Sequence, residues 1–316
     1  MKILHGLSNK KGVFFTAVAI LLAGIIVSSF SAQASYREKE RMSVIETRVN
    51  TMNSFFKDVK KDLSRGLYIS GYRSFLAMGE YINTYGNYID DADARFSEAI
   101  LNGTVKSVQI DVIRNQTILD WSRKIEAQAN SIGLNVDISM INISVRHIDP
   151  WTVEVVSSVS IMANDTRETV SLSKVDTISS TISIVGLEDP LYIINSNGRV
   201  FNTIVQGNSS TFSNASRLIG HLNLSLYIAS NSAPDFMMRL EGNLSNSSFG
   251  IESLVNVNEF AIQGLAVKQR SNVDYVYFGN QSLSICLVNE TINDASFNWF
   301  RLDSGHLNVY SAECGG

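Results

Sequence analysis

The 316-residue sequence has little of what metal sites and catalytic centres are usually built from. It contains two cysteines and four histidines, and the histidines (His5, His147, His221 and His306) are far apart. None of them has the H-E-x-x-H spacing of a zinc-binding helix, and two cysteines alone cannot form a structural zinc site. A phosphate-binding glycine loop, a G-x-G-x-x-G motif and a G-x-S-x-G motif are all missing. We therefore expect no catalysis, no metal and no cofactor.

One enzymatic alternative stays open at this point. An exported hydrolase would need a surface cleft that brings His147, His221 or His306 beside a serine and an acid. Counting such residues in a sequence this long has no specificity, so only the three-dimensional arrangement can test the alternative.

Charge is absent from a 22-residue run between Val13 and Ala34. As a helix this run would be about 33 Å long, enough to cross a hydrocarbon core of about 30 Å. Lys2, Lys10 and Lys11 precede the run, so the positive-inside rule predicts a cytoplasmic N-terminus. We expect a single-pass protein of the cell membrane whose main body is extracellular.

The residues around Gly12 resemble a known processing signal. Lys11-Gly12 followed by Val13-Phe14-Phe15-Thr16 is similar to the signal of type IV prepilins, as found in large archaeal pilin-like proteins and in minor pseudopilins. The resemblance implies cleavage between Gly12 and Val13 and an apolar helix that packs against other pilin-like subunits. Many bacterial pilins carry a glutamate at the fifth mature position, where this chain has Ala17. That difference favours a minor subunit, acting in filament assembly or surface contact.

Two other fates of the N-terminus remain open. Ala32-Gln33-Ala34 is a small-x-small site, so signal peptidase could cut between Ala34 and Ser35 and release a soluble protein. The run could also stay uncut as a plain anchor. Either fate would suit an anchored or secreted glycosylated adhesin or solute-binding ectodomain that does not polymerise. The apolar run exceeds the 7–15 residues typical of a signal-peptide core, which favours the anchored interpretations.

The remaining composition indicates an extracellular protein that does not bind nucleic acid. Residues 101–316 hold 13 basic and 20 acidic side chains, an excess that argues against nucleic acid, while any small-molecule ligand stays unknown. Cys286 and Cys314 form an even pair, which predicts one disulfide in an oxidising compartment. N-x-[ST] sequons occur about twice as often as chance predicts, which favours a glycoprotein. The eleven candidate asparagines are Asn102, Asn115, Asn142, Asn164, Asn208, Asn214, Asn223, Asn243, Asn246, Asn280 and Asn289.

A heptad-like apolar stripe follows the uncharged run. Its residues recur at alternating spacings of three and four, which predicts a helix with one apolar seam. The seam could pack against a helix of another subunit or against the protein's own head. Its members are Met42, Ile45, Val49, Met52, Phe56, Val59 and Leu63.

Further along, the pattern predicts an α+β protein. We expect the stem helix to break or bend near Gly66 and Gly71, acids at 90–93 to open a helix, and another helix over 118–132. Alternating apolar residues then predict three antiparallel strands between 134 and 185, with a bulge near Met140. Residues 195–198 are predicted to form a hairpin turn and residues 249–256 a short helix. The strands predicted for the C-terminal part are 222–229, 236–240, 273–278, 283–288 and 307–310.

These predictions combine into one domain plan. A leader (1–12) precedes a transmembrane or assembly helix (13–34), then a helical stem with packing helices (35–133). An antiparallel β region (134–206) follows, and a mostly β C-terminal domain with the disulfide (207–316) ends the chain. An Asn/Ser-rich stretch at 207–216 is the expected interdomain loop.

Overall fold

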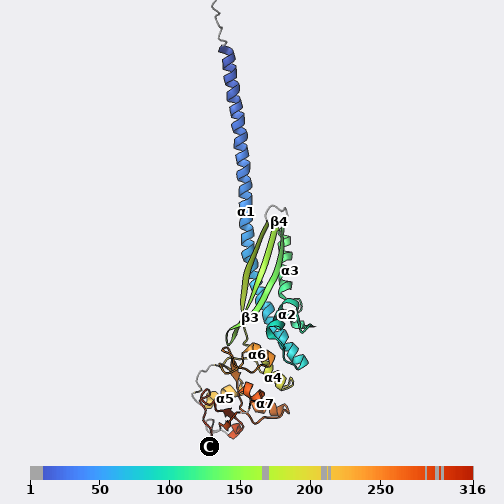
Figure 1. The fold of residues 1–316 in the computed structure, drawn as a ribbon, viewed down its shortest axis with the longest axis vertical. Helices are drawn as coiled ribbons and strands as arrows, with labels where there is room; N and C mark the ends of the chain where they lie inside the picture. The colour runs from blue at the N-terminus through green and yellow to red at the C-terminus, as the bar shows by residue number, and fades with distance from the viewer. Residues whose placement is uncertain are drawn as a thin grey trace, which may run out of the picture.

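The computed structural model describes residues 10–165, 171–207, 212, 215–281, 283–288, 292 and 295–315, and its dominant element is one long helix. Helix α1 (Lys10–Tyr85) has 76 residues, which corresponds to about 114 Å. Its N-terminal part projects alone from a head that is built around its C-terminal part (Figure 1). The α+β class, the long apolar N-terminal helix and the antiparallel sheet are all confirmed.

The expected break at Gly66 and Gly71 is wrong, because α1 stays helical through both glycines. A glycine inside a helix costs only about 1 kcal/mol relative to alanine, which packing can outweigh. Both positions are points of close contact. A Cβ on Gly66 would lie 3.0 Å from Cγ of Trp121, and one on Gly71 would lie 2.6 Å from Cδ1 of Ile182.

Two shorter helices pack beside α1, and local capping explains where they begin. Helix α2 (Ala92–Asn102) starts after Asp91, whose side chain accepts a hydrogen bond from the backbone of Ala94, so the acids at 90–93 open a helix as predicted. Helix α3 (Ile118–Ser131) starts with a capping box between Thr117 and Asp120. Between them lie β1 (Thr104–Val105), β2 (Val108–Gln109) and a turn of 3-10 helix at Asp111–Ile113.

A three-stranded antiparallel sheet forms the second layer of the head. Its strands β3 (Leu134–Asp149), β4 (Thr152–Asp165) and β5 (Ser171–Ser183) lie in sequence order. The predicted bulge is confirmed, because the β3–β4 register shifts between Met140 and Asn142. Helix α1 runs along β5 and α3 along β3, so the helices cover one face of the sheet.

The C-terminal part consists of short helices and two-stranded ribbons. The helices are α4 (Pro190–Asn195), α5 (Ala215–Asn223), α6 (Phe236–Glu241), α7 (Val257–Ile262) and α8 (Asp274–Phe278), with a 3-10 turn at Ala295–Phe297. The ribbons pair β6 (Tyr227–Ala229) with β7 (Ile251–Ser253) and β8 (Ile285–Leu287) with β9 (Arg301–Asp303).

Several sequence predictions for this part are wrong. Residues 236–240 and 273–278 are mostly helical, 249–256 contains a strand, and 307–310 is a turn. Short apolar runs cannot be assigned by periodicity alone, and in α6 the caps decide the outcome. Asp235 accepts from the backbone of Met238, and Gly242 ends the helix in the left-handed conformation. Residues 195–198 end helix α4 and do not connect two strands.

Two hydrophobic clusters divide the head. The first contains α1 from Met52 onward, α2, α3 and the inner face of the sheet. The second belongs to the C-terminal part and includes Leu191, Tyr192 and Val200, which precede the expected boundary at residue 207. Most of the expected interdomain loop at 207–216 lies outside the described residues.

The close contacts at Gly71 generate a test of α1 as the centre of the first cluster. Replacing Gly71 with leucine places a side chain against Ile182, Phe96 and Val155, so the free energy of unfolding should fall by about 1–3 kcal/mol or more. Gly79 lies in the same helix with open space at its Cβ position, so Gly79→Ala should stabilise by about 0.5–1 kcal/mol. Thermal unfolding followed by circular dichroism measures both. Two variants that shift stability in the same direction would contradict this packing.

Candidate functional site

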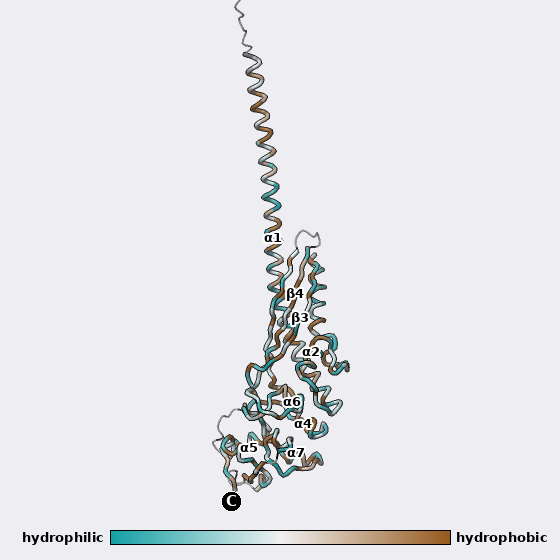
Figure 2. The backbone as a smooth tube through the Cα atoms, viewed as in Figure 1, coloured by the Kyte–Doolittle hydropathy of each residue, from teal (hydrophilic) through white to brown (hydrophobic). Residues whose placement is uncertain are grey.

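The exposed arm of α1, residues 12–50, is the most unusual surface of the molecule. Every described side chain from Gly12 to Thr47 is exposed, including Phe15, Ile20 and Phe30, which are about 70% exposed. This helix is long and apolar enough to cross a membrane and lies near the N-terminus. Figure 2 shows its apolar first part followed by a hydrophilic stretch before the head begins. Exposed apolar surface on this scale marks a membrane or protein contact.

Both predicted processing sites lie on this arm. Gly12 is two residues from the start of α1, while Ala34 and Ser35 lie in the middle of the continuous helix. Helix ends fray, whereas the middle of a helix has all its backbone hydrogen bonds. The two peptide bonds therefore differ in how much helix must unfold before a peptidase can bind them.

The seven residues of the predicted seam divide into two groups. Met52, Phe56, Val59 and Leu63 are buried in the first hydrophobic cluster, against the protein's own head. Val49 is half-buried, and Met42 and Ile45 are exposed by 70% and 46%. The heptad pattern thus spans a buried part and an exposed part of one helix, and only Met42 and Ile45 are open to another molecule.

Most described sequons are accessible. Asn208, Asn214 and Asn289 lie outside the described residues. Of the eight others Asn164 is half-buried, and seven are exposed: Asn102, Asn115, Asn142, Asn223, Asn243, Asn246 and Asn280. They occur on both units of the head, at helix ends, in loops and on the open face of β3. An exposed acceptor is a requirement for N-glycosylation that these seven positions meet.

The predicted disulfide is confirmed. Cys286 in β8 is bonded to Cys314, and the bond closes a loop of 28 residues with a Cα–Cα distance of 5.5 Å. The bond attaches the C-terminal tail to the β8–β9 ribbon. In the chain-entropy model a loop of this length stabilises the fold by roughly 3–4 kcal/mol.

The three described histidines do not assemble a hydrolase centre. His147 stacks on Phe249, His221 contacts Phe212 and Tyr310, and His306 bonds Asp303 and the hydroxyl of Tyr275. These histidines have no hydrogen bond to a serine hydroxyl within the described part of the chain. Across the same residues, no group of three or more His, Cys, Asp and Glu has metal-binding geometry.

The sequence reasoning missed a buried ionic network around Arg239. Its guanidinium is fully buried and lies 2.5 Å from Asp189 and 3.0 Å from Asp274, both also fully buried. Burial raises the pKa of Asp274, although the charge of Arg239 opposes that shift. Ser253 donates to Asp274 and Tyr227 donates to Asp189, which satisfies further oxygen lone pairs. The only local sign of this network was an arginine inside the apolar segment Phe236–Leu240. Its partners Asp189 and Asp274 are 50 and 35 residues away in the sequence, so no local pattern connects them.

A second buried group lies around His306. Its Nδ1 is 2.8 Å from both carboxylate oxygens of Asp303, and its Nε2 is 3.5 Å from Glu252, which is fully buried. Burial opposes protonation, but the bonds to Asp303 and Glu252 outweigh it and raise the pKa of His306 to about 9. His221, in contrast, is buried mainly among apolar groups, and this burial lowers its pKa to about 4. Both groups of ionic contacts are thus internal to the C-terminal unit.

Comparison of the chain with protein-family models, with curated proteins and with solved structures finds no match.

The two histidines predict opposite pH dependences for the C-terminal unit. The folded pKa of His221, about 4, lies below the ordinary 6.5, so its contribution to stability is lost as pH falls from 6.5 towards 4. The folded pKa of His306, about 9, lies above 6.5, so its contribution is complete below 6.5 and is lost as pH rises through 9. Each contribution is on the order of 3 kcal/mol at most. Thermal unfolding between pH 4.5 and 9 should therefore show a maximum near pH 6.5.

Single substitutions separate the two limbs of this profile. His221→Phe should flatten the acidic limb and leave the alkaline limb unchanged, while His306→Gln should lower stability most below pH 6.5 and flatten the alkaline limb. An acidic limb that stays as steep in the His221→Phe protein would mean that His221 does not titrate as described.

Proposed function

We propose that the protein is a membrane-anchored, extracellular pilin-like subunit of the minor kind that acts in filament assembly or surface contact without catalysis. The observation that carries the proposal is the division of α1 into an exposed apolar arm and a buried stem. The stem holds the head, and the arm is left for a membrane and for other subunits. A long helix laid along its own globular head is the arrangement expected of a pilin-like protein.

The disulfide and the sequons support the extracellular location of the head. Cys286 and Cys314 are bonded, and such bonds persist in oxidising compartments. Seven described sequons are exposed on the head, and none falls on the arm. An arm packed in lipid or among neighbouring helices has no room for a glycan, so this distribution agrees with the proposal.

The helical geometry favours cleavage at Gly12 over cleavage at Ala34. A peptidase that cuts between Ala34 and Ser35 must first unfold the middle of α1, whereas the bond after Gly12 lies within the first turn of the helix. Cleavage at Gly12 also keeps the complete apolar arm in the mature protein.

The mature N-terminus tests the proposal most directly. We expect Val13 as the first residue of the membrane-associated protein, and we expect Gly12→Leu to block processing because the peptidase requires a small residue before the cut. N-terminal sequencing and gel mobility measure both, with Ala34→Leu as the matched control that should still be processed. A first residue of Ser35 would favour a released adhesin or solute-binding protein, and Met1 would favour a plain anchor.

The exposed end of the seam tests assembly. A photo-reactive residue at Tyr36, which is 67% exposed, should cross-link to a neighbouring helix in the native membrane. Met42→Asp with Ile45→Asp should abolish this cross-linking, because two carboxylates would be buried without partners at a cost of several kcal/mol. The head should fold normally, since both residues lie outside its core.

The control adds the same charges to the other face of α1. Ser43 and Asn50 are exposed and polar, so Ser43→Asp with Asn50→Asp should leave cross-linking intact. Cross-linking that is equal in both double variants would show that the seam makes no contact between subunits.

A further inference from the structure

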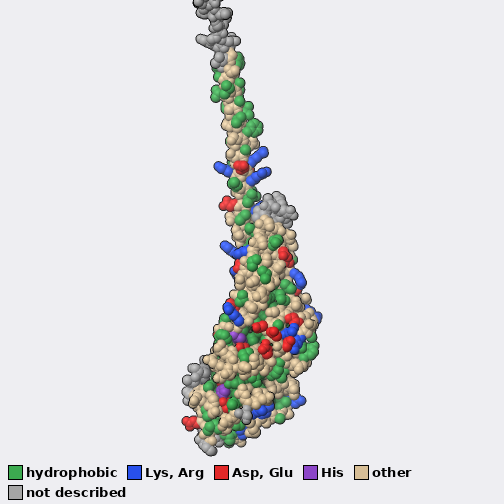
Figure 3. All heavy atoms as spheres, in the orientation of Figure 1, with side chains coloured by type: hydrophobic (Ala, Val, Ile, Leu, Met, Phe, Trp, Pro, Cys, Tyr) green, Lys and Arg blue, Asp and Glu red, His purple; other side chains and the backbone are tan. Residues whose placement is uncertain are grey.

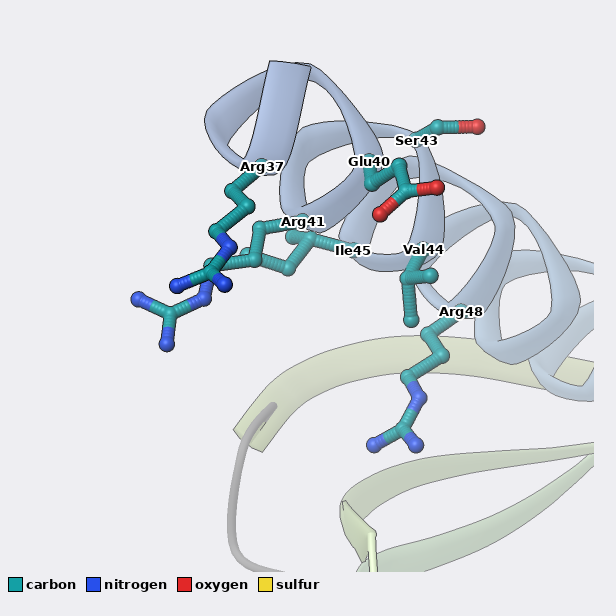
Figure 4. A pocket seen from close by; sticks show the side chains of 7 residues that line it. All are labelled: Arg37, Glu40, Arg41, Ser43, Val44, Ile45 and Arg48. Atoms are coloured by element: carbon teal, nitrogen blue, oxygen red, sulfur yellow. The ribbon is translucent and has the colours of Figure 1, made fainter. Parts of the chain in front are cut away.

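Arg37 and Arg41 form a pair of basic side chains on one face of α1, directly after the apolar run. They are one helical turn apart, and Figure 4 shows both guanidinium groups extending to the same side of the helix. They line a groove of about 890 Å³, whose other lining residues are Glu40, Ser43, Val44, Ile45 and Arg48. Within the described part of the chain, neither Arg37 nor Arg41 has a carboxylate at ion-pair distance.

The same two arginines also line a second groove, whose other end is apolar. That groove of about 430 Å³ is also lined by Phe30, Gln33, Ala34 and Glu38. The spacings from Phe30 through Ala34 and Arg37 to Arg41 are four, three and four residues, which keeps all four on one face of the helix. Apolar surface therefore passes into paired positive charge within about three turns of one helix.

We propose that Arg37 and Arg41 bind the phosphate of an anionic phospholipid whose acyl chain lies against Phe30 and Ala34. This inference rests on the membrane anchoring proposed above. Arginine is suited to phosphate because its planar guanidinium donates two parallel hydrogen bonds. Two arginines at successive turns can hold one phosphate from two sides.

The position along the helix favours a lipid over an acidic surface of another subunit. Headgroups occupy roughly 5–8 Å beyond each side of the hydrocarbon core. Arg37 is about 4.5 Å and Arg41 about 10 Å past Ala34 along the axis, and arginines at helix ends reach back to the interface. Arg48 is about 21 Å past Ala34, beyond the headgroups, and is not part of the site. Figure 3 shows basic side chains gathered on α1 between the apolar end and the head.

Lipid binding by the full-length protein tests the site. Phosphatidylglycerol is titrated onto detergent-solubilised protein, with phosphatidylcholine and inorganic phosphate as comparison ligands, and native mass spectrometry counts the retained molecules. The parent should prefer phosphatidylglycerol, and Arg37→Gln with Arg41→Gln should weaken that binding by roughly tenfold. Inorganic phosphate should bind far more weakly, because it makes no contact with Phe30 and Ala34.

The matched control uses another exposed basic pair on the same helix. Lys57 and Lys61 are also four residues apart but lie about 35 Å or more past Ala34, so Lys57→Gln with Lys61→Gln should bind lipid like the parent. Equal binding by all three proteins, or equal loss in both double variants, would overturn the proposal. Flotation of each protein with vesicles checks anchoring separately. A protein that floats without lipid preference defeats only this inference, and one that does not float defeats the proposed function.

Discussion

The continuity of α1 is the constraint on which the rest of the structure depends. The same helix supplies the exposed arm and the central element of the first hydrophobic cluster, from Met52 to Ile82. A break in α1 between the arm and the buried part would leave the head without a rigid connection to the arm. Gly66 and Gly71 show how tightly the head closes around the stem, because Trp121 and Ile182 occupy the space that side chains would need. The arm has no such packing, so its apolar side chains require a partner outside the chain.

The C-terminal unit contacts α1 through helices α4 and α6. Phe236 packs edge-on against Phe75 of α1, and the backbone of Ile89 donates to the carbonyl of Leu240. The same helix carries Arg239, whose ion pairs reach Asp189 and Asp274 in the second unit. A buried charge left without its partners costs several kcal/mol, so the network holds these segments in one arrangement. Helix α4 also joins the two clusters, because Ile193 belongs to the first while Leu191 and Tyr192 belong to the second.

Features of the fold that depend on local patterns could be predicted from the sequence. Features that depend on contacts between residues far apart in the chain could not. The uncharged run, the period-two strands, the bulge near Met140 and the cysteine pair are each readable within a few residues or by simple counting, and the structure contains all four elements. The short C-terminal segments were misassigned because six apolar residues fit a strand and a buried helix equally well. The heptad stripe was identified correctly as apolar, but its pattern is the same in the buried part at Met52 and in the exposed part at Met42. Only the sheet beside the helix distinguishes the two.

One face of α1 therefore meets three environments in succession. Phe30 and Ala34 belong to the apolar arm, Arg37 and Arg41 follow at the same face, and Met52 and Val59 continue it into the core. The spacings of four, three, four, eleven and seven residues keep these side chains within a narrow sector of the helix. A helix that only had to anchor the protein would not need this alignment. Because this face packs against the sheet further along α1, the two arginines lie on the same side of the helix as the head, beyond the end of the strands (Figure 4). The apolar, the basic and the buried side chains thus follow one another along a single face of α1.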